Sequence, residues 1–412
     1  MTAAQDMPAT RIRHPFYVDA DGINRPPGPD KHPFYTQFAT SGSSLVPVIR
    51  MVQGAPVNAF LVCRYSDVKE VFRRQEIFSR AEAAAADPID VSGTLLGMDG
   101  DEHAQVRGTI KDAFTRPAIH ALRGIVERTA AGQLATMTND RRHAELVQDF
   151  ALPFTLHVIS DLLGLPSQDR MRFRAWGDAF LATGGLTQQE AAQSSMEMGA
   201  YLWQQLEQRR AQATEDLLTR IATAAADQPA HVQIKLAVAL VVGGWETTAS
   251  SIATFVFVLH TRPYLTYASA WDYLLDHPER LDSAIAELQR LYSTSAADEM
   301  PRRVMADVEL PSGARLSKGD IVIPSLDAAH RDPAVFPRPT EMDFDRTPNP
   351  HLGFGHGPHY CIGAHLGKME VRTAIHQMLR ELPDLRLAVP AAQIPWKAGH
   401  SLISPERLPI EW

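Results

Sequence analysis

The order of hydrophobic and polar positions divides the chain into a helical middle and strand-like flanks. Between Glu102 and about Leu288, apolar residues recur at the three- and four-residue spacing of amphipathic helices. Short apolar runs with strand character precede this region in "AFLVCRY" (59–65) and follow it in "RRVMADVEL" (302–310) and "GDIVIPS" (319–325). The pattern predicts a mainly α-helical fold with small β-sheets at the two ends of the sequence.

Two further helices are predicted outside the helical middle. "SDVKEVFRRQ" (66–75) has helical spacing and begins with Ser66, a residue type that caps helix N-termini. "AHLGKMEVRTAIHQMLREL" (364–382) has the same spacing over a longer stretch. We therefore expect a short helix near the first strands and a long helix near the C-terminus.

The chain shows no internal repeat and no low-complexity linker. Pro-rich stretches at 24–34 and 337–350 interrupt regular structure and mark extended segments. We therefore expect a single domain over residues 1–412, with residues 1–30 as an extended or partly flexible N-terminus.

The most apolar long segment, 236–260, has a carboxylate in its middle. Glu246 would cost roughly 3 kcal/mol at the centre of a bilayer on insertion scales. This segment is therefore interpreted as a buried helix, and no membrane association is expected.

Charge and composition narrow the classes of function. The chain has 412 residues, of which 45% are apolar, and 48 acidic against 40 basic side chains give a net charge of −8 without a basic tract. Such a chain is expected to form a globular core and not to bind nucleic acid.

The first residues, "MTAAQDMPATRIRHPFYV", lack the apolar centre of a signal peptide, and two cysteines cannot build a disulfide framework. We therefore expect a cytoplasmic protein, and a monomer.

One of the two cysteines lies in an unusual stretch, "FGHGPHYCIG" (354–363). A lone cysteine is most often a small core hydrophobe, an interpretation that suits Cys63 in its apolar strand. Cys361 could instead bind zinc together with His356, His359 and His365, although so compact a run would hardly close a tetrahedron. It could also be a nucleophile paired with a histidine, but no base, orienting group or oxyanion hole is identified nearby.

The neighbours of Cys361 favour a fourth interpretation, a thiolate ligand to haem iron. Gly355, Gly357 and Gly363, with Pro358, leave little side-chain bulk in which to bury a thiol and let a flat ligand approach the backbone. The cysteine comes just before a predicted helix, whose N-terminus stabilises negative charge, and glycine amides could donate to the sulfur.

The long apolar segment carries a second unusual stretch, "VVGGWETTASS" (241–251). Gly243 and Gly244 each cost roughly 1 kcal/mol relative to alanine inside a helix, so either close helix packing or a functional opening must explain them. Glu246 and Thr247 follow at once, and a carboxylate beside hydroxyls in an apolar helix is costly unless it is paired or functional. The stretch suggests a widened turn that admits a small ligand and protons.

Together these stretches resemble the motifs of the cytochrome P-450 family. The family's haem-loop pattern is met by Phe354, Gly357, His359, Cys361 and Gly363. Its oxygen-handling pattern, Ala or Gly, Gly, any residue, Asp or Glu, Thr, is met by 243–247, and the order of all motifs agrees from about residue 60 to 380. The resemblance implies a single-domain cytochrome P-450 fold, mainly α with small β-sheets, in which haem b (iron protoporphyrin IX) lies between the long central helix and the helix that follows the cysteine loop.

The resemblance also implies roles for single residues. Cys361 would be the axial ligand of the haem iron. Thr247 would hydrogen-bond the dioxygen at the iron, and Glu246 would help to relay protons. The propionates would be held by His103, Arg107, Arg302 (with Arg303 as second choice) and His359. Further cofactor contacts would come from Phe354, Gly355, Gly357 and Gly363 in the loop and from Gly243 and Gly244, which would leave space over the iron. A buried structural network would join Glu287, Arg290 and Arg346.

The function implied is that of a soluble bacterial-type monooxygenase. It would use dioxygen to hydroxylate or epoxidise a small-to-medium hydrophobic substrate in secondary-metabolite biosynthesis, with electrons from NAD(P)H through a ferredoxin or flavodoxin and its reductase. Oxidative cyclisation or coupling on the same fold is an alternative. A non-catalytic haem sensor is a third, against which Glu246 and Thr247 argue. Substrate contacts would come from 81–98, about 170–196, the helix around Ala237, Val241 and Gly244, and 397–404.

The sequence departs from the family pattern in three places. About five extra residues lie in "YLTYASAWDYLLDHPERL" (264–281), and "STSAADEMP" (293–301) lacks the usual proline after Arg290. His330 stands where asparagine is more common. Substrate analogies around 293–301 are therefore weak.

Overall fold

The computed structural model describes most of the chain. The described residues are 12–13, 28–52, 55–86, 91–169, 172–173, 176, 188–294, 300–397 and 402–412. Contacts divide the chain into two compact units, each built from three segments. The first, called the sheet unit, comprises Met1–Ala104, Gln289–Met342 and Pro348–Cys361, and the second, called the helical unit, comprises Gln105–Leu288, Asp343–Thr347 and Ile362–Trp412. The single domain expected over residues 1–412 stays a prediction, and most of the expected N-terminal extension (1–11 and 14–27) lies outside the described residues.

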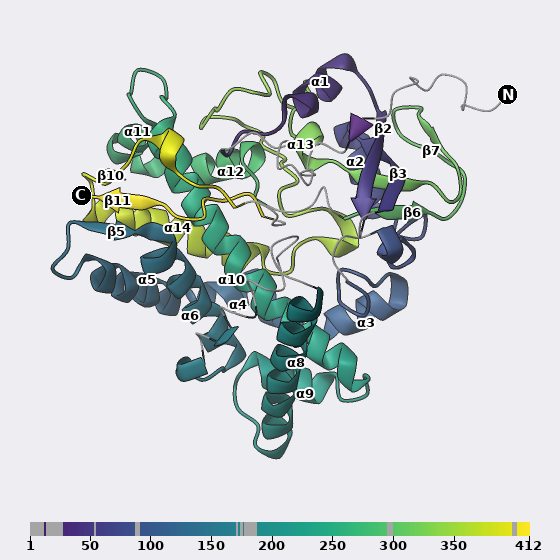
Figure 1. Ribbon diagram of the computed structural model, residues 1–412, viewed down its shortest axis with the longest axis horizontal. Coiled ribbons are helices and arrows are strands. Elements are labelled where there is room, and N and C mark those ends of the chain that lie inside the picture. Colours follow the sequence, from purple (N-terminus) through teal and green to yellow (C-terminus); the bar gives the residue numbers. More distant parts are fainter. Residues whose placement is uncertain are drawn as a thin grey trace. The chain divides into compact units, whose positions relative to one another are not determined.

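The sheet unit is organised around a six-stranded sheet of order β1-β2-β3-β9-β6-β4 (Figure 1). Its strands are β1 (Ile12–Arg13), β2 (Leu45–Val52), β3 (Ala55–Val62), β4 (Phe78–Ser79), β6 (Arg302–Val304) and β9 (Ile321–Pro324). β2 and β3 form an antiparallel hairpin, whereas β3 runs parallel to β9. A separate hairpin joins β7 (Val308–Glu309) to β8 (Arg315–Leu316). The strands predicted on both flanks of the sequence are confirmed, but they meet in one sheet and not in separate sheets at the two ends.

Helices cover both faces of this sheet. Alternate residues of a strand point to opposite faces, so Leu61 and Ile323 pack with α1 (Pro33–Ser41), while Val62 and Val322 pack with α2 (Tyr65–Arg73). The short helix α13 (Leu326–Ala329) follows β9 directly, and the 3-10 helix η2 (Ala81–Ala86) follows β4.

The predicted helix 66–75 forms as α2, but the predicted cap at Ser66 is wrong. The helix begins at Tyr65, and its N-cap residue, Arg64, makes no side-chain cap. The carboxylate of Asp332 takes that role by accepting a hydrogen bond from the N–H of Tyr65 (3.0 Å). The free N–H groups at the start of a helix can donate to any correctly placed acceptor, and here a residue distant in sequence provides that acceptor.

The helical unit is built around α10 (Ala230–Thr261), the long apolar helix predicted from the sequence (Figure 1). α10 contacts α6, α8, α9, α11 and α14. The helices of this unit are α4 (Arg116–Ala121), α5 (Arg123–Thr138), α6 (Leu152–Leu163), α8 (Gln188–Ala211), α9 (Leu217–Ala224), α11 (Ala270–Asp276) and α14 (Ala364–Glu381). Short helical turns are η3 (Lys111–Phe114), the π-helical η4 (Val147–Ala151), η5 (Ser167–Asp169), η6 (Pro278–Arg280) and η9 (Ala391–Gln393). A three-stranded sheet of β10 (Arg386–Leu387), β11 (Pro409–Glu411) and β5 (His143–Glu145) completes the unit.

Among the described residues, α10 is the one helix long and apolar enough to cross a membrane, but 78% of its most apolar window is buried inside the protein. It therefore has the burial of a core helix, as the sequence predicted. Two other helices, α3 (Gly100–Ile110) and α12 (Leu281–Leu291), begin among the residues of one unit and end among those of the other.

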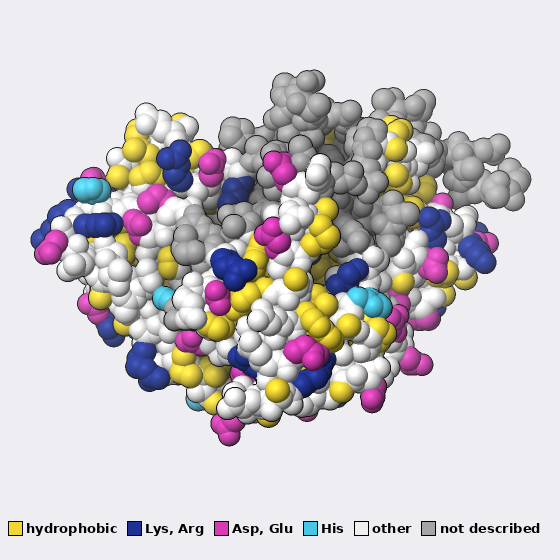
Figure 2. Space-filling view, turned by 60° about the horizontal axis from the view of Figure 1, so that its bottom comes forward, with side chains coloured by type: hydrophobic (Ala, Val, Ile, Leu, Met, Phe, Trp, Pro, Cys, Tyr) yellow, Lys and Arg dark blue, Asp and Glu magenta, His cyan; other side chains and the backbone are white. Residues whose placement is uncertain are grey.

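The face of the protein shown in Figure 2 mixes both signs of charge. On the face shown in Figure 2, Lys and Arg side chains alternate with Asp and Glu and do not gather into one patch. This distribution matches the spread of acidic and basic residues along the sequence.

Candidate functional site

The stretch that carries Cys361 forms a closed loop in the sheet unit. The N–H of Cys361 donates to the carbonyl of Phe354 (2.9 Å), and the N–H of Gly355 donates to that of Leu352 (2.7 Å). One 3-10 turn, η8 (Gly357–His359), lies within the loop. The loop thereby places Cys361 just before the residues that open α14.

The two cysteines lie in opposite surroundings. Cys63 follows β3 and is fully buried, with its sulfur 3.6 Å from the carbonyl oxygen of Leu61. Cys361 is exposed. The interpretation as a small core hydrophobe therefore holds for Cys63 and fails for Cys361.

The loop glycines have separable roles. Gly355 and Gly357 have φ angles of 73° and 69°, in the left-handed region that other residues rarely adopt. A Cβ on Gly357 would also lie 2.5 Å from the carbonyl oxygen of Phe72, so the loop packs directly on the backbone of α2. Gly363 has φ −82°, and a Cβ there would meet no atom within 4 Å. Two glycines therefore shape the loop, and the third leaves open space next to the protein backbone.

His359 is held by an acidic residue that the sequence reading did not identify. Its Nε2 lies 3.4 Å from Oδ1 of Asp99, and its ring lies 4.2 Å from the ring of His103 on α3. Asp99 also accepts hydrogen bonds from Ser79 Oγ (2.7 Å) and the N–H of Ala81 (2.9 Å). Burial alone would raise the pKa of Asp99, but the hydrogen bonds from His359, Ser79 and Ala81 outweigh it and hold the pKa at about 2. Asp99 is therefore ionised near neutral pH.

Two buried arginines lie close to the histidine pair. Arg302 is 2% exposed and Arg80 is 1% exposed, and both donate to the carbonyl of Pro301 (3.4 and 2.8 Å). The pKa of His359 is lowered chiefly by burial, and the charges of Arg302 and Arg80 lower it further, against the hydrogen bond to Asp99. Two guanidinium groups and two imidazoles therefore lie close together in the sheet unit, where His359 pairs with the carboxylate of Asp99. Such a group of hydrogen-bond donors suits an anionic group such as a carboxylate of a ligand.

Two further arginines were predicted to belong to this cationic group: Arg303, as second choice to Arg302, and Arg107. Arg303 directs its Nε to the carbonyl of Glu82 (2.9 Å) and is less buried than Arg302, which favours Arg302. Arg107 lies one turn after His103 on α3 and is half-buried.

The zinc alternative finds no support in the geometry. Among the residues that the structure describes, no three His, Cys, Asp or Glu side chains gather as a metal site would require. His359, one of the four proposed ligands, instead contacts Asp99 and His103.

The two glycines of α10, in the helical unit, do not behave alike. A Cβ on Gly243 would meet no atom within 4 Å, as expected for a position that leaves space for a ligand. A Cβ on Gly244 would lie 2.7 Å from Cδ1 of Ile159 on α6. The expectation that both glycines leave open space is therefore wrong for Gly244, which lets two helices pack closely.

The polar residues after the glycines are engaged with their surroundings. Thr247 Oγ1 donates to the carbonyl of Gly243 (2.7 Å), so the lone pairs of this oxygen can still accept a hydrogen bond. Glu246 is fully buried, and its Oε1 accepts a hydrogen bond from Nζ of Lys397. The sequence indicated Lys397 only as the first residue of a late substrate-contact segment.

Contacts of the three residues in the predicted structural network are described within each unit by itself. In the helical unit, Nε of Arg346 lies 3.1 Å from both carboxylate oxygens of Glu287, and both side chains are buried. In the sheet unit, Arg290 donates to the carbonyls of His330 (2.7 Å) and Pro339 (2.6 Å). Direct pairing of Glu287 with Arg290 stays a prediction.

Sequence reasoning missed Arg80, Asp99 and Lys397. Arg80 is a single arginine after a short strand, and its burial depends on a carbonyl 221 residues away. Asp99 lies 260 residues from its partner His359, and Lys397 lies 151 residues from its partner Glu246. No local spacing could have identified any of the three.

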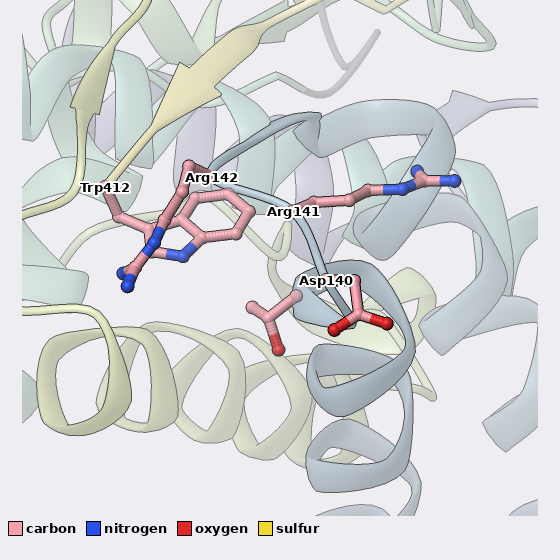
Figure 3. A pocket seen from close by; sticks show the side chains of 5 residues that line it. Asp140, Arg141, Arg142 and Trp412 are labelled. Carbon is pink, nitrogen blue, oxygen red and sulfur yellow. The ribbon is translucent and has the colours of Figure 1, made fainter.

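A surface hollow in the helical unit contains none of the predicted site residues. It has a volume of about 400 Å³ and is lined by Thr138, Asp140, Arg141, Arg142 and Trp412. Figure 3 shows the side chains of Arg141 and Arg142 pointing in opposite directions, so they do not converge on one ligand.

Comparison with known proteins gives consistent matches. The profile of the cytochrome P-450 family matches residues 275–388. The mycinamicin IV hydroxylase/epoxidase of Micromonospora griseorubida is 37% identical over 89% of this chain and 92% of its own length. The nocardicin C N-oxygenase of Nocardia uniformis subsp. tsuyamanensis is 34% identical over 93% of this chain and 96% of its own. The crystal structure of a cytochrome P-450 with biaryl coupling reactivity superposes with a TM-score of 0.87, at 29% identity, over 98% of this chain and 100% of that one.

Proposed function

Since the chain belongs to the cytochrome P-450 family and is a haem-dependent monooxygenase, we propose that the Cys361 thiolate is the axial ligand of a haem b. The observation that carries this assignment is the contrast between the two cysteines. Cys63 is buried in the core, whereas Cys361 is exposed at the end of a glycine-shaped loop that leads into α14.

The donor set of the sheet unit suits this cofactor. Haem has two carboxylates, and His103, His359 and Arg302 form a buried group of hydrogen-bond donors in which His359 pairs with Asp99. We add Arg80 to the residues proposed to hold the propionates, together with Arg107 from the sequence. The open space at Gly363 and Gly243 is consistent with a ligand that approaches the backbone closely.

When bound, haem would supply the oxidising chemistry, and the thiolate of Cys361 would hold its iron and tune its reactivity. The residues of the chain place the substrate and control protons. The hydroxyl of Thr247 donates a hydrogen bond to the carbonyl oxygen of Gly243, so the Thr247 oxygen can still accept a hydrogen bond from a protonated partner. Glu246 is the one carboxylate of the central stretch 241–251 and is proposed to deliver protons from its Oε2 atom.

The proposed substrate is a small-to-medium hydrophobic secondary metabolite that is hydroxylated or epoxidised. Support comes from the hydroxylase/epoxidase and the N-oxygenase among the relatives. Oxidative cyclisation or coupling is the second candidate, favoured by the structural likeness to an enzyme with biaryl coupling reactivity. Ala237 and Val241, on the helix proposed to contact substrate, are apolar and buried. The other proposed substrate-contact segments fall partly on 87–90, 170–187 and 398–401, where several or all positions lie outside the described residues.

Electrons are proposed to come from NAD(P)H through a ferredoxin or flavodoxin and its reductase. The relatives match over 92% and 96% of their own length, so the matched region of this chain corresponds to nearly the whole of each relative. We further propose that the enzyme works as a cytoplasmic monomer.

The absorption spectrum of the reduced protein under carbon monoxide tests the ligand assignment. We expect a strongly red-shifted Soret band, which the Cys361→Ala substitution abolishes because it removes the thiolate. Cys63→Ala is the matched control and should retain the band, since its sulfur lies in the apolar core. Equal effects of the two substitutions would show that the ligand is misassigned.

A further inference from the structure

One face of α10 is joined to a late hairpin of the helical unit. The name hairpin is used here only for the two described segments, 396–397 and 402–405. They are paired by a hydrogen bond from the N–H of Lys397 to the carbonyl oxygen of Ser404 (3.0 Å) and by the bridge between Trp396 and Pro405. Four side chains of α10 contact it, at positions 246, 250, 254 and 257. The contacts are Glu246 with Lys397, Ser250 Oγ with Ser404 Oγ (3.2 Å), Thr254 Oγ1 with the carbonyl of Ile403 (3.4 Å), and the ring of Phe257 with that of Trp396 (5.2 Å).

These four positions recur at intervals of three or four residues, so they share one side of the helix. The first of the four contacts is the only one among them that involves charge. The hairpin is therefore attached along α10 by neutral contacts and ends in an ion pair at the residue next to Thr247.

The ion pair is buried on its acidic side. The Glu246 side chain is 0% exposed and that of Lys397 is 16% exposed. A carboxylate taken out of water inside an apolar helix requires a compensating charge, which the ammonium provides. Only Oε1 is bonded to Lys397, while Oε2 is buried and has no hydrogen-bond partner among the described residues. One oxygen of Glu246 is thus fixed and the other is left to interact with a proton donor or acceptor.

We propose that Lys397 is a positioning residue for proton delivery. Its ammonium holds Oε1 of Glu246 in place, which fixes Oε2 as the atom that carries the proton. Glu246 directly precedes Thr247 in the sequence. The proton comes from solvent and ends in the water formed when dioxygen is reduced, and the two electrons for this reduction are those proposed above to come from NAD(P)H through the redox partner. This inference rests on the proposed function of Glu246.

The Lys397→Met substitution in the holoenzyme is the test, because methionine keeps most of the length and removes the charge. Thr254→Val is the matched control, since it removes another contact between hairpin and helix without altering charge. Lys397→Arg keeps the charge and should rescue. Holoenzyme is supplied with NADPH, a ferredoxin and its reductase in buffer made with H₂O or D₂O, and the rate of NADPH consumption is measured.

We expect Lys397→Met to consume NADPH about tenfold more slowly than the unaltered enzyme, because general acid catalysis contributes at least this much. D₂O should slow the Lys397→Met variant more than the unaltered enzyme. Thr254→Val should behave as the unaltered enzyme does, and Lys397→Arg should recover most of the rate. Rates of Lys397→Met equal to those of Thr254→Val would overturn the proposal.

A readout independent of turnover is the urea midpoint of unfolding. If the ion pair forms, the double variant Glu246→Gln with Lys397→Met should have a higher midpoint than the added losses of the two single variants predict. Additive losses would overturn the pairing itself. Loss of the red-shifted carbon monoxide band in Lys397→Met, or a lowered midpoint with unchanged rates, would mean a purely structural role and also overturn the proposal. Failure of haem ligation would appear separately, in the unaltered enzyme's own carbon monoxide spectrum.

Discussion

His330 illustrates how burial determines the charge state of a single residue. It is completely buried in the sheet unit, and its Nε2 accepts a hydrogen bond from the N–H of Leu352 (2.8 Å). Burial lowers its pKa well below the ordinary value of 6.5, and the positive charges of Arg290, Arg331 and Lys31 act in the same direction. The imidazole is therefore neutral in the folded protein.

We predict that His330→Asn makes stability less dependent on pH. Because the folded-state pKa is lowered, His330 stabilises the fold fully above pH 6.5, and this contribution is lost as the pH falls below 6.5 and the unfolded chain binds a proton. Asparagine can accept the same hydrogen bond and does not titrate. Between pH 7.5 and 5.5, the unaltered protein should lose about 1 kcal/mol more unfolding free energy than the variant. Urea titrations at the two pH values measure this difference, and equal losses would contradict it.

At the scale of elements, α10 combines close packing with an opening in adjacent residues. Gly244 faces Ile159 of α6 at a distance that leaves no room for a methyl group, while Gly243 faces open space. The same residue type therefore serves two purposes in consecutive positions of one helix.

We predict opposite effects of alanine at these two positions. Gly244→Ala should lower the unfolding free energy by on the order of 1 kcal/mol, because overpacking exceeds the gain in helix propensity. Gly243→Ala should be neutral or raise it by up to about 1 kcal/mol. Urea denaturation measures both.

Ile159→Val supplies the control for the first of these effects. It removes the Cδ1 atom that a methyl at position 244 would approach most closely, at 2.7 Å. Combined with Gly244→Ala it should recover part of the lost stability. An equal response of the two glycines to alanine would show that packing against α6 does not distinguish them.

At the scale of the whole molecule, the chain passes repeatedly between its two compact units. The five-residue segment Asp343–Thr347 belongs to the helical unit, although the residues on both sides of it belong to the sheet unit. Its contacts explain this assignment: Arg346 pairs with Glu287, and Tyr264 Oη accepts a hydrogen bond from the N–H of Phe344 (2.9 Å) and stacks on its ring. A buried ion pair and an aromatic contact thus determine where the segment lies.

We predict that Glu287→Gln is strongly destabilising. Removal of the carboxylate leaves the buried guanidinium of Arg346 without its counter-charge, which costs about 3–5 kcal/mol. The pair of Glu309 with Arg315 is the matched control, because its N–O distance of 3.0 Å is similar but both side chains are more than half exposed. Glu309→Gln should cost less than about 1 kcal/mol, since solvent screens exposed pairs. Chemical denaturation compares the two variants, and similar losses would refute the role of burial.

The local features of this protein could be predicted from its sequence. The apolar periodicity of α10 and α14, the strand character of β3, β6 and β9, and the glycine-rich loop at Cys361 all follow from residues close together in the chain. Helix periodicity and turn chemistry are properties of neighbouring residues, so they can be predicted without knowledge of the fold. The interpretation of Cys63 as a core residue, and of Cys361 as a residue outside the core, was likewise predicted from the residues beside each cysteine.

The partners of these features were decided only by the tertiary structure. Asp332 caps α2 in place of Ser66, Ile159 explains Gly244, Asp99 holds His359, and Lys397 neutralises Glu246. Each of these contacts joins residues far apart in sequence, and packing between elements, not local spacing, determines which side chains meet. The sequence by itself therefore determined which residues are suited to the chemistry, and only the fold decided which charges and hydrogen bonds hold them in place.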